Sequence, residues 1–495
     1  MEKSQKTSNY PAPSPWSLKG VIPLTGPADE SLELALGAPP AALGWLRAGF
    51  SAGVRRRQPW LLDGLDSPDQ AAARWAARYF RRGVPVLSLG AIDDGHWRVS
   101  EKGASALSLQ CVDGVPAAIY LVRQTGRHVF LVIDEAVARA WPVFDAGVEG
   151  GSAWVFRGGE SAKTVESAAA ICRELRAQVG SAAREDVVVV AVGGGVVLDL
   201  AGFVAALFGL THINIPTTLL GMVDASIGGK TGVNFAPWGK NQVGSFHFPE
   251  SVILSPEFLT TLPKEEILAG GAECIKHAFI AGDWDMAARW AEVLGRGEVP
   301  DSGLIRSAIA LKDRVVQADP YELIGSAAND ELVISREYLN LGHTIGHALE
   351  SWSMDKLNVI LRHGAAVAFG LLCKSKLLCQ VDPASSAVAE KMAAILFQSG
   401  CLQEISSWFV RFLGEPSDDK VAGLWQELLP LIMQDKKLAA GGLGTNAPVP
   451  IRVAGFCASE GTMAGSFPAV GMLDVSEESL RKAFKDSLKV LLQRF

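Results

Sequence analysis

Short runs of apolar, β-branched residues alternate with helical stretches between about residue 106 and residue 256 of this chain. Val129–Ile133 predicts a strand, and residues 163–179 predict a helix. Residues 186–192 are apolar at nearly every position and predict a buried strand that runs directly into three glycines, and Ile213–Pro216 predicts another strand. Strands that alternate with helices in this way are typical of a parallel α/β sheet.

The first 105 residues follow a different pattern. Residues 1–20 are polar and proline-rich, which predicts a flexible tail. Residues 21–105 are rich in Ala, Trp and Arg, and they contain a predicted helix from Ser67 to Gly83 with a proline at its first position. The pattern does not indicate a role for this N-terminal extension.

Beyond about residue 256, Leu and Ala recur at steps of three and four, which predicts helices up to Phe495. No internal repeat interrupts this pattern. We therefore expect an α/β domain of nucleotide-binding type followed by an α-helical domain, with an extra N-terminal segment in front. The expected divisions are residues 1–20, 21–105, 106–262 and 263–495.

Composition narrows the possible functions. The 46 Lys and Arg residues and the 53 Asp and Glu residues leave a net charge of −7, which argues against a general nucleic-acid binder or a protein of anionic membrane surfaces. The seven cysteines are scattered and form no C-x-x-C pair, so no disulfide framework is indicated and a reducing cytoplasm fits best. The N-terminus lacks an apolar signal region, and the most apolar run, Val187–Leu210, contains Asp199 and five glycines, so we expect no export signal and no membrane anchor.

Two glycine-rich turns are candidates for ligand contact. Gly193, Gly194 and Gly195 join a predicted strand to a predicted helix, where backbone N–H groups can approach a pyrophosphate, although the pattern is not G-x-G-x-x-G and a simple tight turn fits equally well. The stretch from Gly228 to Thr231 resembles the end of a phosphate-binding P-loop, but position 224 is Asp where that loop requires Gly. What remains is a turn that places Asp224 and Lys230 near a polar ligand, with Lys240 and Asn241 following.

Two sets of polar residues have helical spacing. Glu273, Lys276 and His277 share one face if residues 268–280 are helical, and their small or apolar neighbours indicate burial rather than a solvated face. Arg336, Asn340, His343 and His347 follow at steps of four, three and four, which predicts a single polar stripe on one helix.

Three of the eight histidines lie between residues 343 and 363. His343 and His347 have the spacing of a metal-binding pair, but the Glu of H-E-x-x-H is absent, which argues against a metalloprotease. Together with His363 and the buried Glu273 they indicate a metal site of the catalytic type, with a position left open. Lys312 and the Lys436-Lys437 pair complete the candidate cations.

Seven segments then follow one another in the order of a known family. They are GGGVVLDLAGF (193–203), IPTTLLGMVDASIGGKTGVN (215–234), GKNQVGSFHFP (239–249), TLPKEEILAGGAECIKH (261–277), LNLGHTIGHALE (339–350), RHGAAVAFG (362–370) and MQDKK (433–437). From about residue 106 to residue 490 the chain resembles the 3-dehydroquinate synthase family of sugar phosphate cyclases.

The resemblance implies a Rossmann-like NAD-binding domain, a helical metal-binding domain, Zn²⁺ or Co²⁺ as cofactor, and a homodimer. It implies Glu273, His343 and His363 as metal ligands, and His347 as a group that binds the phosphate or assists proton transfer. The residues that it implies for the substrate are Asp224, Lys230, Asn241, Lys276, Lys312, Arg336, Asn340 and Lys436. Those that it implies for NAD are Glu160, Gly193, Gly194, Gly195, Asp199, Thr217, Thr218 and Lys240.

The family's chemistry is a transient oxidation of a sugar phosphate by NAD, followed by phosphate elimination, reduction back and ring closure. Arg336, Asn340 and His347 favour the carboxylate-bearing substrate of the shikimate pathway, 3-deoxy-arabino-heptulosonate 7-phosphate. Cyclases of sedoheptulose 7-phosphate carry Pro where His347 stands. The anionic sugar phosphate is thus the expected partner.

Several positions depart from the family pattern. Residues 207–210 lack the arginine that the family provides for phosphate, Leu198 and Ala365 replace a Gly and a Glu, and a longer loop separates Lys312 from Arg336. These departures suggest a divergent paralogue in a specialised pathway. The alternatives are a sedoheptulose 7-phosphate cyclase, a polyol dehydrogenase of related fold, and a pseudoenzyme, against which the complete metal triad argues.

Overall fold

The computed structural model describes residues 109–494 except 113, 145–151, 181, 236–238, 323–334, 415–416, 437–450 and 457–469, together with four short strands that precede residue 102. The four strands form an antiparallel sheet in the order β1-β3-β4-β2. They are β1 (Ile22–Pro23), β2 (Leu61–Asp63), β3 (Val86–Ala91) and β4 (His96–Glu101). The predicted tail and the predicted helix from Ser67 to Gly83 lie outside the described residues.

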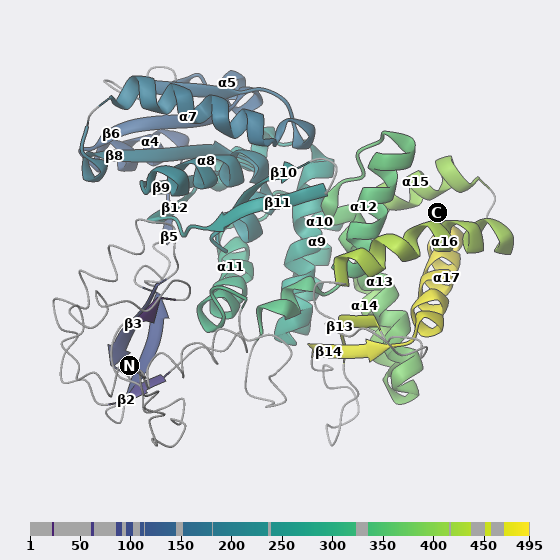
Figure 1. Cartoon of the computed structure of the whole chain (residues 1–495). Coiled ribbons are helices and arrows are strands. Elements are labelled where there is room, and N and C mark those ends of the chain that lie inside the picture. Colours follow the sequence, from purple (N-terminus) through teal and green to yellow (C-terminus); the bar gives the residue numbers. More distant parts are fainter. Residues whose placement is uncertain are drawn as a thin grey trace, which may run out of the picture.

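Six parallel strands form the centre of the α/β part (Figure 1). In spatial order they are β5 (Leu109–Cys111), β12 (Ser251–Leu254), β9 (Thr211–Pro216), β8 (Val187–Gly193), β6 (His128–Asp134) and β7 (Ser152–Phe156). The register pairs Val188 of β8 with Val129 on one side and Thr211 on the other. This arrangement confirms the predicted strands and the Rossmann-like fold class.

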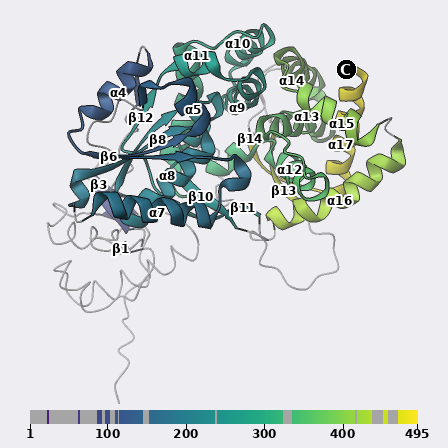
Figure 2. The ribbon, with the colours of Figure 1, turned by 90° about the horizontal axis from the view of Figure 1, so that it is seen from above.

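Helices cover both faces of this sheet, because successive side chains of a strand point to opposite sides. Phe130 and Val189 belong to the apolar cluster that includes α7 and α8, whereas Leu131 and Val190 belong to the cluster that includes α4. Figure 2 shows α4 and α7 on opposite sides of the sheet. The helices are α4 (Val115–Arg123), α5 (Glu135–Ala140), α7 (Val165–Val179) and α8 (Gly195–Phe208).

The direction in which the chain crosses the sheet reverses between β6 and β8. From β6 the chain moves outward to β7, then returns to β8 and continues to β9 and β12. The loops after β6 and β8 therefore diverge, and parallel α/β sheets bind their ligands outside the strand ends at such a point. The glycine turn at residues 193–195 lies there, because β8 ends at Gly193 and α8 begins at Gly195.

Helices make up most of the described chain after residue 263, and they lie beside the α/β part in Figure 1. The central one is α13, which contacts α9, α12, α14, α15 and α17. The helices are α9 (Lys264–Ala281), α10 (Trp284–Gly295), α11 (Ser302–Ala318), α12 (His343–Leu357), α13 (His363–Val381), α14 (Ser386–Ser399), α15 (Gln403–Leu413), α16 (Asp418–Lys436) and α17 (Glu477–Arg494).

The expectation of helices up to Phe495 is wrong at two places. β13 (Ile451–Phe456) and β14 (Val470–Val475) form an antiparallel pair that lies between α16 and α17 in the chain. Val453 and Phe456 are buried in the core of the helical part. Each strand is short, and its backbone hydrogen bonds go to a partner far along the chain, so the local pattern of apolar residues does not reveal the pairing.

Of the described helices, α13 is long and apolar enough to cross a membrane, with a mean hydropathy of 1.3 over its most apolar stretch. In the structure 78% of that stretch is buried inside the protein. Phe369 on α13 packs against Phe409 and Phe484, with ring centroids 5.0 and 5.5 Å away. Its apolar composition is therefore that of a central core helix.

Glycines allow α13 to approach its neighbours closely. A Cβ atom on Gly364, in the first turn of α13, would overlap the carbonyl oxygen of Ala269 on α9. A Cβ on Gly370 would overlap the carbonyl oxygen of Gly342, the residue before α12. The start of α13 is thus held close to α9, and the start of α12 is held close to α13; each start carries a histidine.

We expect the Gly364→Ala substitution to destabilise the helical part by about 1–3 kcal/mol, because the added methyl group must displace backbone rather than a flexible side chain. The measurement is the thermal unfolding midpoint. Gly423→Ala is the matched control, since Gly423 is an exposed residue of α16 with no atom within 4 Å of its Cβ position. That change should be neutral or slightly stabilising, and equal midpoints for both variants would contradict the close-contact argument.

Candidate active site

The glycine turn after β8 leaves the start of α8 open to a ligand. No side chain caps the first turn of α8, so its N–H groups have no side-chain acceptor. The turn is hydrogen-bonded to the residue that follows β9, because the N–H of Thr217 donates to the carbonyl oxygen of Gly193 at 3.0 Å. A Cβ on Gly194 would lie 3.0 Å from Cγ2 of Thr218. The geometry therefore suits an anion such as a pyrophosphate at the helix terminus.

A hydrogen-bond network lies beside this turn. Its centre is Lys163, which is buried and donates from Nζ to Oδ2 of Asp199 at 2.5 Å and to Oδ1 of Asn241 at 2.6 Å. Burial raises the pKa of Asp199, although the Lys163 ammonium opposes this effect. Asn234 donates to Oε1 of Glu160 at 2.9 Å and accepts from the N–H of Asn241 at 2.9 Å.

This network contains both expected and unexpected residues. The structure places Asn241, expected near substrate, with Glu160 and Asp199, which were expected near NAD. No sequence motif points to Lys163, which lies three residues after Glu160 and directly before Thr164, the residue that caps α7. The hairpin of β10 (Lys230–Phe235) and β11 (Gly239–Phe246) carries both Asn234 and Asn241.

Three helices bring the predicted metal ligands together. Glu273 is fully buried in α9, His343 begins α12 and His363 begins α13. Oε1 of Glu273 lies 3.7 Å from Nε2 of His343 and 3.4 Å from Nε2 of His363. Two ligands bound tetrahedrally at about 2.0–2.2 Å from one ion lie roughly 3.3–3.6 Å apart, so these two distances are close to those that a zinc-sized cation requires.

Hydrogen bonds orient both imidazoles toward Glu273. Nδ1 of His343 lies 3.2 Å from the carbonyl oxygen of Leu341, and Nδ1 of His363 lies 2.8 Å from Oε1 of Glu350. Each Nε2 is therefore left for a metal. Both carboxylate oxygens of Glu273 are buried without a hydrogen bond, although Oε2 forms an ion pair with Lys276. Oε1, which faces the two imidazole nitrogens and has no hydrogen bond, therefore fits a cation as its partner.

Burial and neighbouring charges shift the pKa values of these three residues in different directions. Burial favours the neutral form of Glu273, but the Lys276 ammonium and the histidines outweigh it and hold its pKa well below the usual range. Burial lowers the pKa of His343. Burial has the same tendency at His363, yet the carboxylates of Glu350 and Glu273 overcome it and raise the pKa to about 10. A metal must therefore displace a proton from His363 when it binds.

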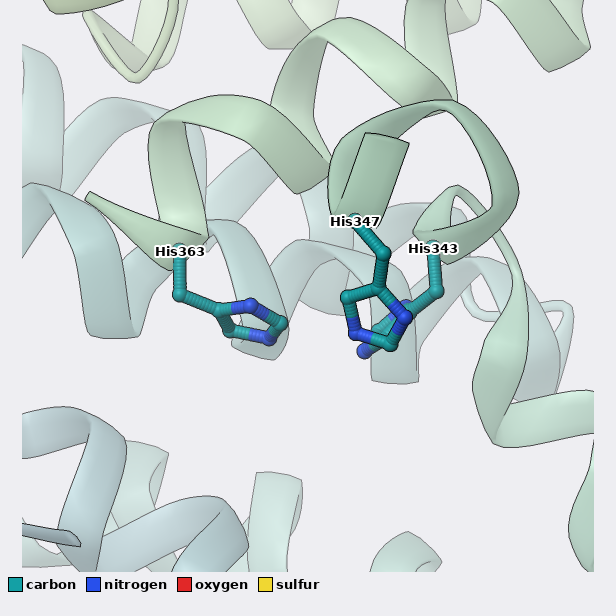
Figure 3. A group of neighbouring side chains, drawn as sticks. All are labelled: His343, His347 and His363. Carbon is teal, nitrogen blue, oxygen red and sulfur yellow. The ribbon is translucent and has the colours of Figure 1, made fainter. Parts of the chain in front are cut away.

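His347 lies one turn after His343 on α12. Figure 3 shows the rings of His343, His347 and His363 directed into one space. The ring centroid of His347 lies 5.0 Å from that of His343 and 5.7 Å from that of His363, and nitrogens of the three rings lie within 4.8 Å of one another. This position is compatible with a third imidazole ligand and with a substrate-side role.

A set of charges adjoins the metal site, in which Lys312 and His277 are buried and Asp224 is partly buried. Lys312 on α11 donates from Nζ to Oδ1 of Asp224, which lies in the short π-helical turn Gly221–Ala225. Burial would raise the pKa of Asp224, but Lys312 holds it well below its ordinary value. Nε2 of His277 is 3.9 Å from Oδ1 of Asp224, and burial lowers the pKa of His277 to about 3. Glu273, Lys276 and His277 thus share a buried helix, as their spacing predicts.

The predicted single stripe from Arg336 to His347 is wrong. Arg336–Asn340 forms a 3₁₀ helix, and Gly342, with a φ of 84°, separates it from α12, which begins at His343. A left-handed residue cannot continue a right-handed helix, so the spacing of four, three and four does not describe one face. Asn340 is the last residue of the 3₁₀ helix.

Like Lys276 and Lys312, two more of the predicted substrate cations have acceptors in the protein. Arg336 donates from Nη2 to the carbonyl oxygen of Gly228 and from Nη1 to that of Pro320, both at 2.5 Å. Lys230 donates from Nζ to Oε2 of Glu322 at 2.5 Å. No sequence motif points to Glu322, which directly precedes the undescribed residues 323–334. Lys436 is the last residue of α16, and its side chain lies outside the described part of the chain.

Comparison with known proteins places this chain in a family. Residues 153–269 match the family model "3-dehydroquinate synthase N-terminal", and residues 270–438 match "3-dehydroquinate synthase C-terminal". The 3-dehydroquinate synthase of Opitutus terrae is 41% identical over 279 residues, which cover 55% of this chain and 72% of that protein.

Two solved structures share the fold. ValA (2-epi-5-epi-valiolone synthase) from Streptomyces hygroscopicus subsp. jinggangensis 5008, with NAD⁺ and Zn²⁺ bound, has a TM-score of 0.60 and 21% identity, over 81% of this chain and 100% of that one. 2-Deoxy-scyllo-inosose synthase, complexed with carbaglucose-6-phosphate, NAD⁺ and Co²⁺, has a TM-score of 0.57 and 20% identity, over 81% and 99%. These two likenesses show the fold, and the matches along the sequence show that the chain belongs to the 3-dehydroquinate synthase family.

Proposed function

We propose that this chain is an NAD- and metal-dependent sugar phosphate cyclase that acts on 3-deoxy-arabino-heptulosonate 7-phosphate and releases phosphate. The observation that carries the proposal is the convergence of Glu273, His343 and His363 beside buried cations. The three converging side chains suit a metal ion, and the buried cations beside them suit an anionic substrate. The identity to the 3-dehydroquinate synthase of Opitutus terrae supports the choice of substrate.

The residues present fit both cofactors. When bound, NAD⁺ supplies a hydride acceptor and the divalent metal supplies a Lewis acid. We assign the metal to Glu273, His343 and His363, because Oε1 of the buried carboxylate faces both imidazoles and has no hydrogen bond. We assign NAD to the uncapped start of α8 and the adjoining network. ValA contains NAD⁺ with Zn²⁺, and 2-deoxy-scyllo-inosose synthase contains NAD⁺ with Co²⁺, which supports these two assignments.

The chain's own groups would bind and orient the substrate. Lys276 keeps the Glu273 carboxylate ionised in a buried place. Lys312 lies in the same cluster, and burial lowers its pKa, so that Nζ releases a proton more readily than an exposed lysine does. Bonds to two carbonyl oxygens fix the guanidinium of Arg336 and use two of its five N–H donors. The remaining donors can bind a carboxylate or phosphate.

One observation favours a related substrate as second candidate. Residues 207–210, where the family provides an arginine for phosphate, end α8 instead: Leu207 is exposed and Gly209 caps the helix with a φ of 63°. A missing charged partner weakens phosphate binding by about 1–3 kcal/mol. Because the site departs here from the family's phosphate contacts, we retain another sugar phosphate, such as sedoheptulose 7-phosphate, as the alternative; the missing contact alone does not choose between the two 7-phosphates.

We expect purified protein with Zn²⁺ and NAD⁺ to release inorganic phosphate from 3-deoxy-arabino-heptulosonate 7-phosphate, and to do so faster than from sedoheptulose 7-phosphate. The measurements are phosphate release and absorbance at about 340 nm, where NADH absorbs. NADH should not accumulate, because the cofactor is returned to its oxidised form in each cycle. Lasting NADH formation would identify a dehydrogenase instead, and no phosphate from either substrate would refute the proposal.

We expect the His343→Ala variant to lose its zinc, from about one ion per chain to nearly none, because a ligand is removed. The His347→Ala variant should keep the zinc but turn over about 10²–10⁴-fold more slowly, as expected when a proton-transfer group is lost. Metal analysis of dialysed protein and kcat provide the two readouts. His128→Ala is the control, because His128 begins β6 at the end of the sheet opposite the glycine turn that follows β8. Equal zinc loss in both active-site variants would make the three histidines the metal site.

A further inference from the structure

We propose that Glu350 is a positioning residue that couples the metal site to the cofactor site, through His363 on one side and Lys240 on the other. The inference rests on the proposed function, since it requires that the chain bind a divalent metal and NAD. Glu350 belongs to neither of the two ligand sets assigned above. Its contacts show what it does between them.

Both oxygens of the Glu350 carboxylate are engaged. Glu350 is buried on α12, seven residues after His343. Its Oε1 accepts from Nδ1 of His363 at 2.8 Å, and its Oε2 accepts from Nζ of Lys240 at 3.0 Å. A buried carboxylate is stable only when it is paired and hydrogen-bonded, so its two partners must stay in place together.

The bond to His363 sets the direction of a metal ligand. Nδ1 faces Glu350, so Nε2 faces Oε1 of Glu273 at 3.4 Å. A carboxylate behind a ligating histidine fixes the ring's orientation and raises its basicity, and loss of such a carboxylate typically weakens metal binding by 10–100-fold. Glu350 therefore affects metal binding through His363 and is not itself one of the assigned metal ligands.

The bond to Lys240 reaches the α/β part of the molecule. Lys240 lies on β11, next to Asn241, whose side chain accepts from Lys163 and whose N–H donates to Asn234. Neighbouring residues of one strand thus connect to two different sites. Asn241 has a left-handed backbone with a φ of 53°, a conformation that Asn adopts more readily than most residues, and its two bonds connect this turn of the hairpin to the network.

The two sites are consequently linked by a short chain of contacts. NAD bound against the Asn241 network would hold the β10–β11 hairpin, the hairpin would hold Lys240 on Glu350, and Glu350 would hold His363. If the first ligand orders the shared hairpin, the second ligand pays a smaller cost in conformational entropy when it binds. Each ligand therefore favours binding of the other, and the coupling is positive. By linkage, NAD⁺ must raise the affinity for metal by the same factor as metal raises the affinity for NAD⁺.

A purely structural role for Glu350 makes a different prediction. If the residue only paired two buried charges, its replacement would lower the stability of the helical part but leave metal and cofactor binding independent of each other. The Glu350→Gln substitution keeps the size of the side chain and one carbonyl acceptor. The Lys240→Met substitution tests the same link from its partly exposed end, where a folding defect is less of a concern.

The experiment measures the affinity of the full-length, metal-free protein for Zn²⁺ by competition with a chromophoric chelator, with and without saturating NAD⁺. The visible absorption of bound Co²⁺ reports the ligand geometry separately. For the native chain we expect Zn²⁺ to bind at least about 5-fold more tightly with NAD⁺ present. Glu350→Gln should bind Zn²⁺ about 10–100-fold more weakly, with an altered Co²⁺ spectrum.

In both Glu350→Gln and Lys240→Met the effect of NAD⁺ on Zn²⁺ affinity should fall to about onefold. Glu427→Gln is the control, because Glu427 also contacts α12, at Nε1 of Trp352, but on the surface. Native Zn²⁺ affinity and native NAD⁺ dependence in Glu350→Gln would overturn the inference and leave the proposed function intact. A native chain that binds neither Zn²⁺ nor NAD⁺ would instead overturn the proposed function.

Discussion

The helical part of this protein depends on one buried charge. Glu273 has no exposed surface, and neither of its oxygens forms a hydrogen bond in the described structure. A buried carboxylate is costly unless cations surround it. Lys276 provides one cation, and the starts of α12 and α13 bring two imidazoles within 4 Å. The geometry of three helices is thus tied to a single side chain.

This arrangement needs backbone contacts that ordinary side chains would prevent. Gly364 lets the first turn of α13 lie against Ala269, four residues before Glu273 on α9. Gly370 does the same against Gly342, which precedes α12. The residues that shape the site therefore include glycines that provide no chemical group. Their contribution is the short distance between helices, and an added methyl group would increase it.

The charges of the site form two linked groups. One group contains Lys163, Asp199 and Asn241 at the carboxyl end of the sheet, and the other contains the residues around Glu273. The β10–β11 hairpin lies between them, because adjacent residues of β11 bond to each group. A protein that must align a dinucleotide with a metal ion benefits from such a rigid connection, since small displacements of reacting groups slow a reaction strongly.

Much of the fold and part of the site follow from local patterns in the chain. The continuous apolar run before Gly193 is compatible only with a buried strand or helix, and its length and β-branched residues favour the strand that is observed. The helical spacing of Glu273, Lys276 and His277 among small residues correctly indicates a buried polar face. The succession of motifs identifies the family, because seven ordered segments rarely coincide by chance.

Other features depend on contacts between distant segments, which no local pattern records. The break at Gly342 is a left-handed turn, and the sequence spacing of Arg336 and His343 is equally consistent with an unbroken helix. The roles of Lys163 and Glu350 arise from partners 36 and 13 residues away. The antiparallel pair β13–β14 exists because each strand satisfies the other's backbone. Local sequence therefore determined the elements and the type of chemistry, whereas tertiary packing decided which groups meet, because that depends on how closely distant helices and strands can approach.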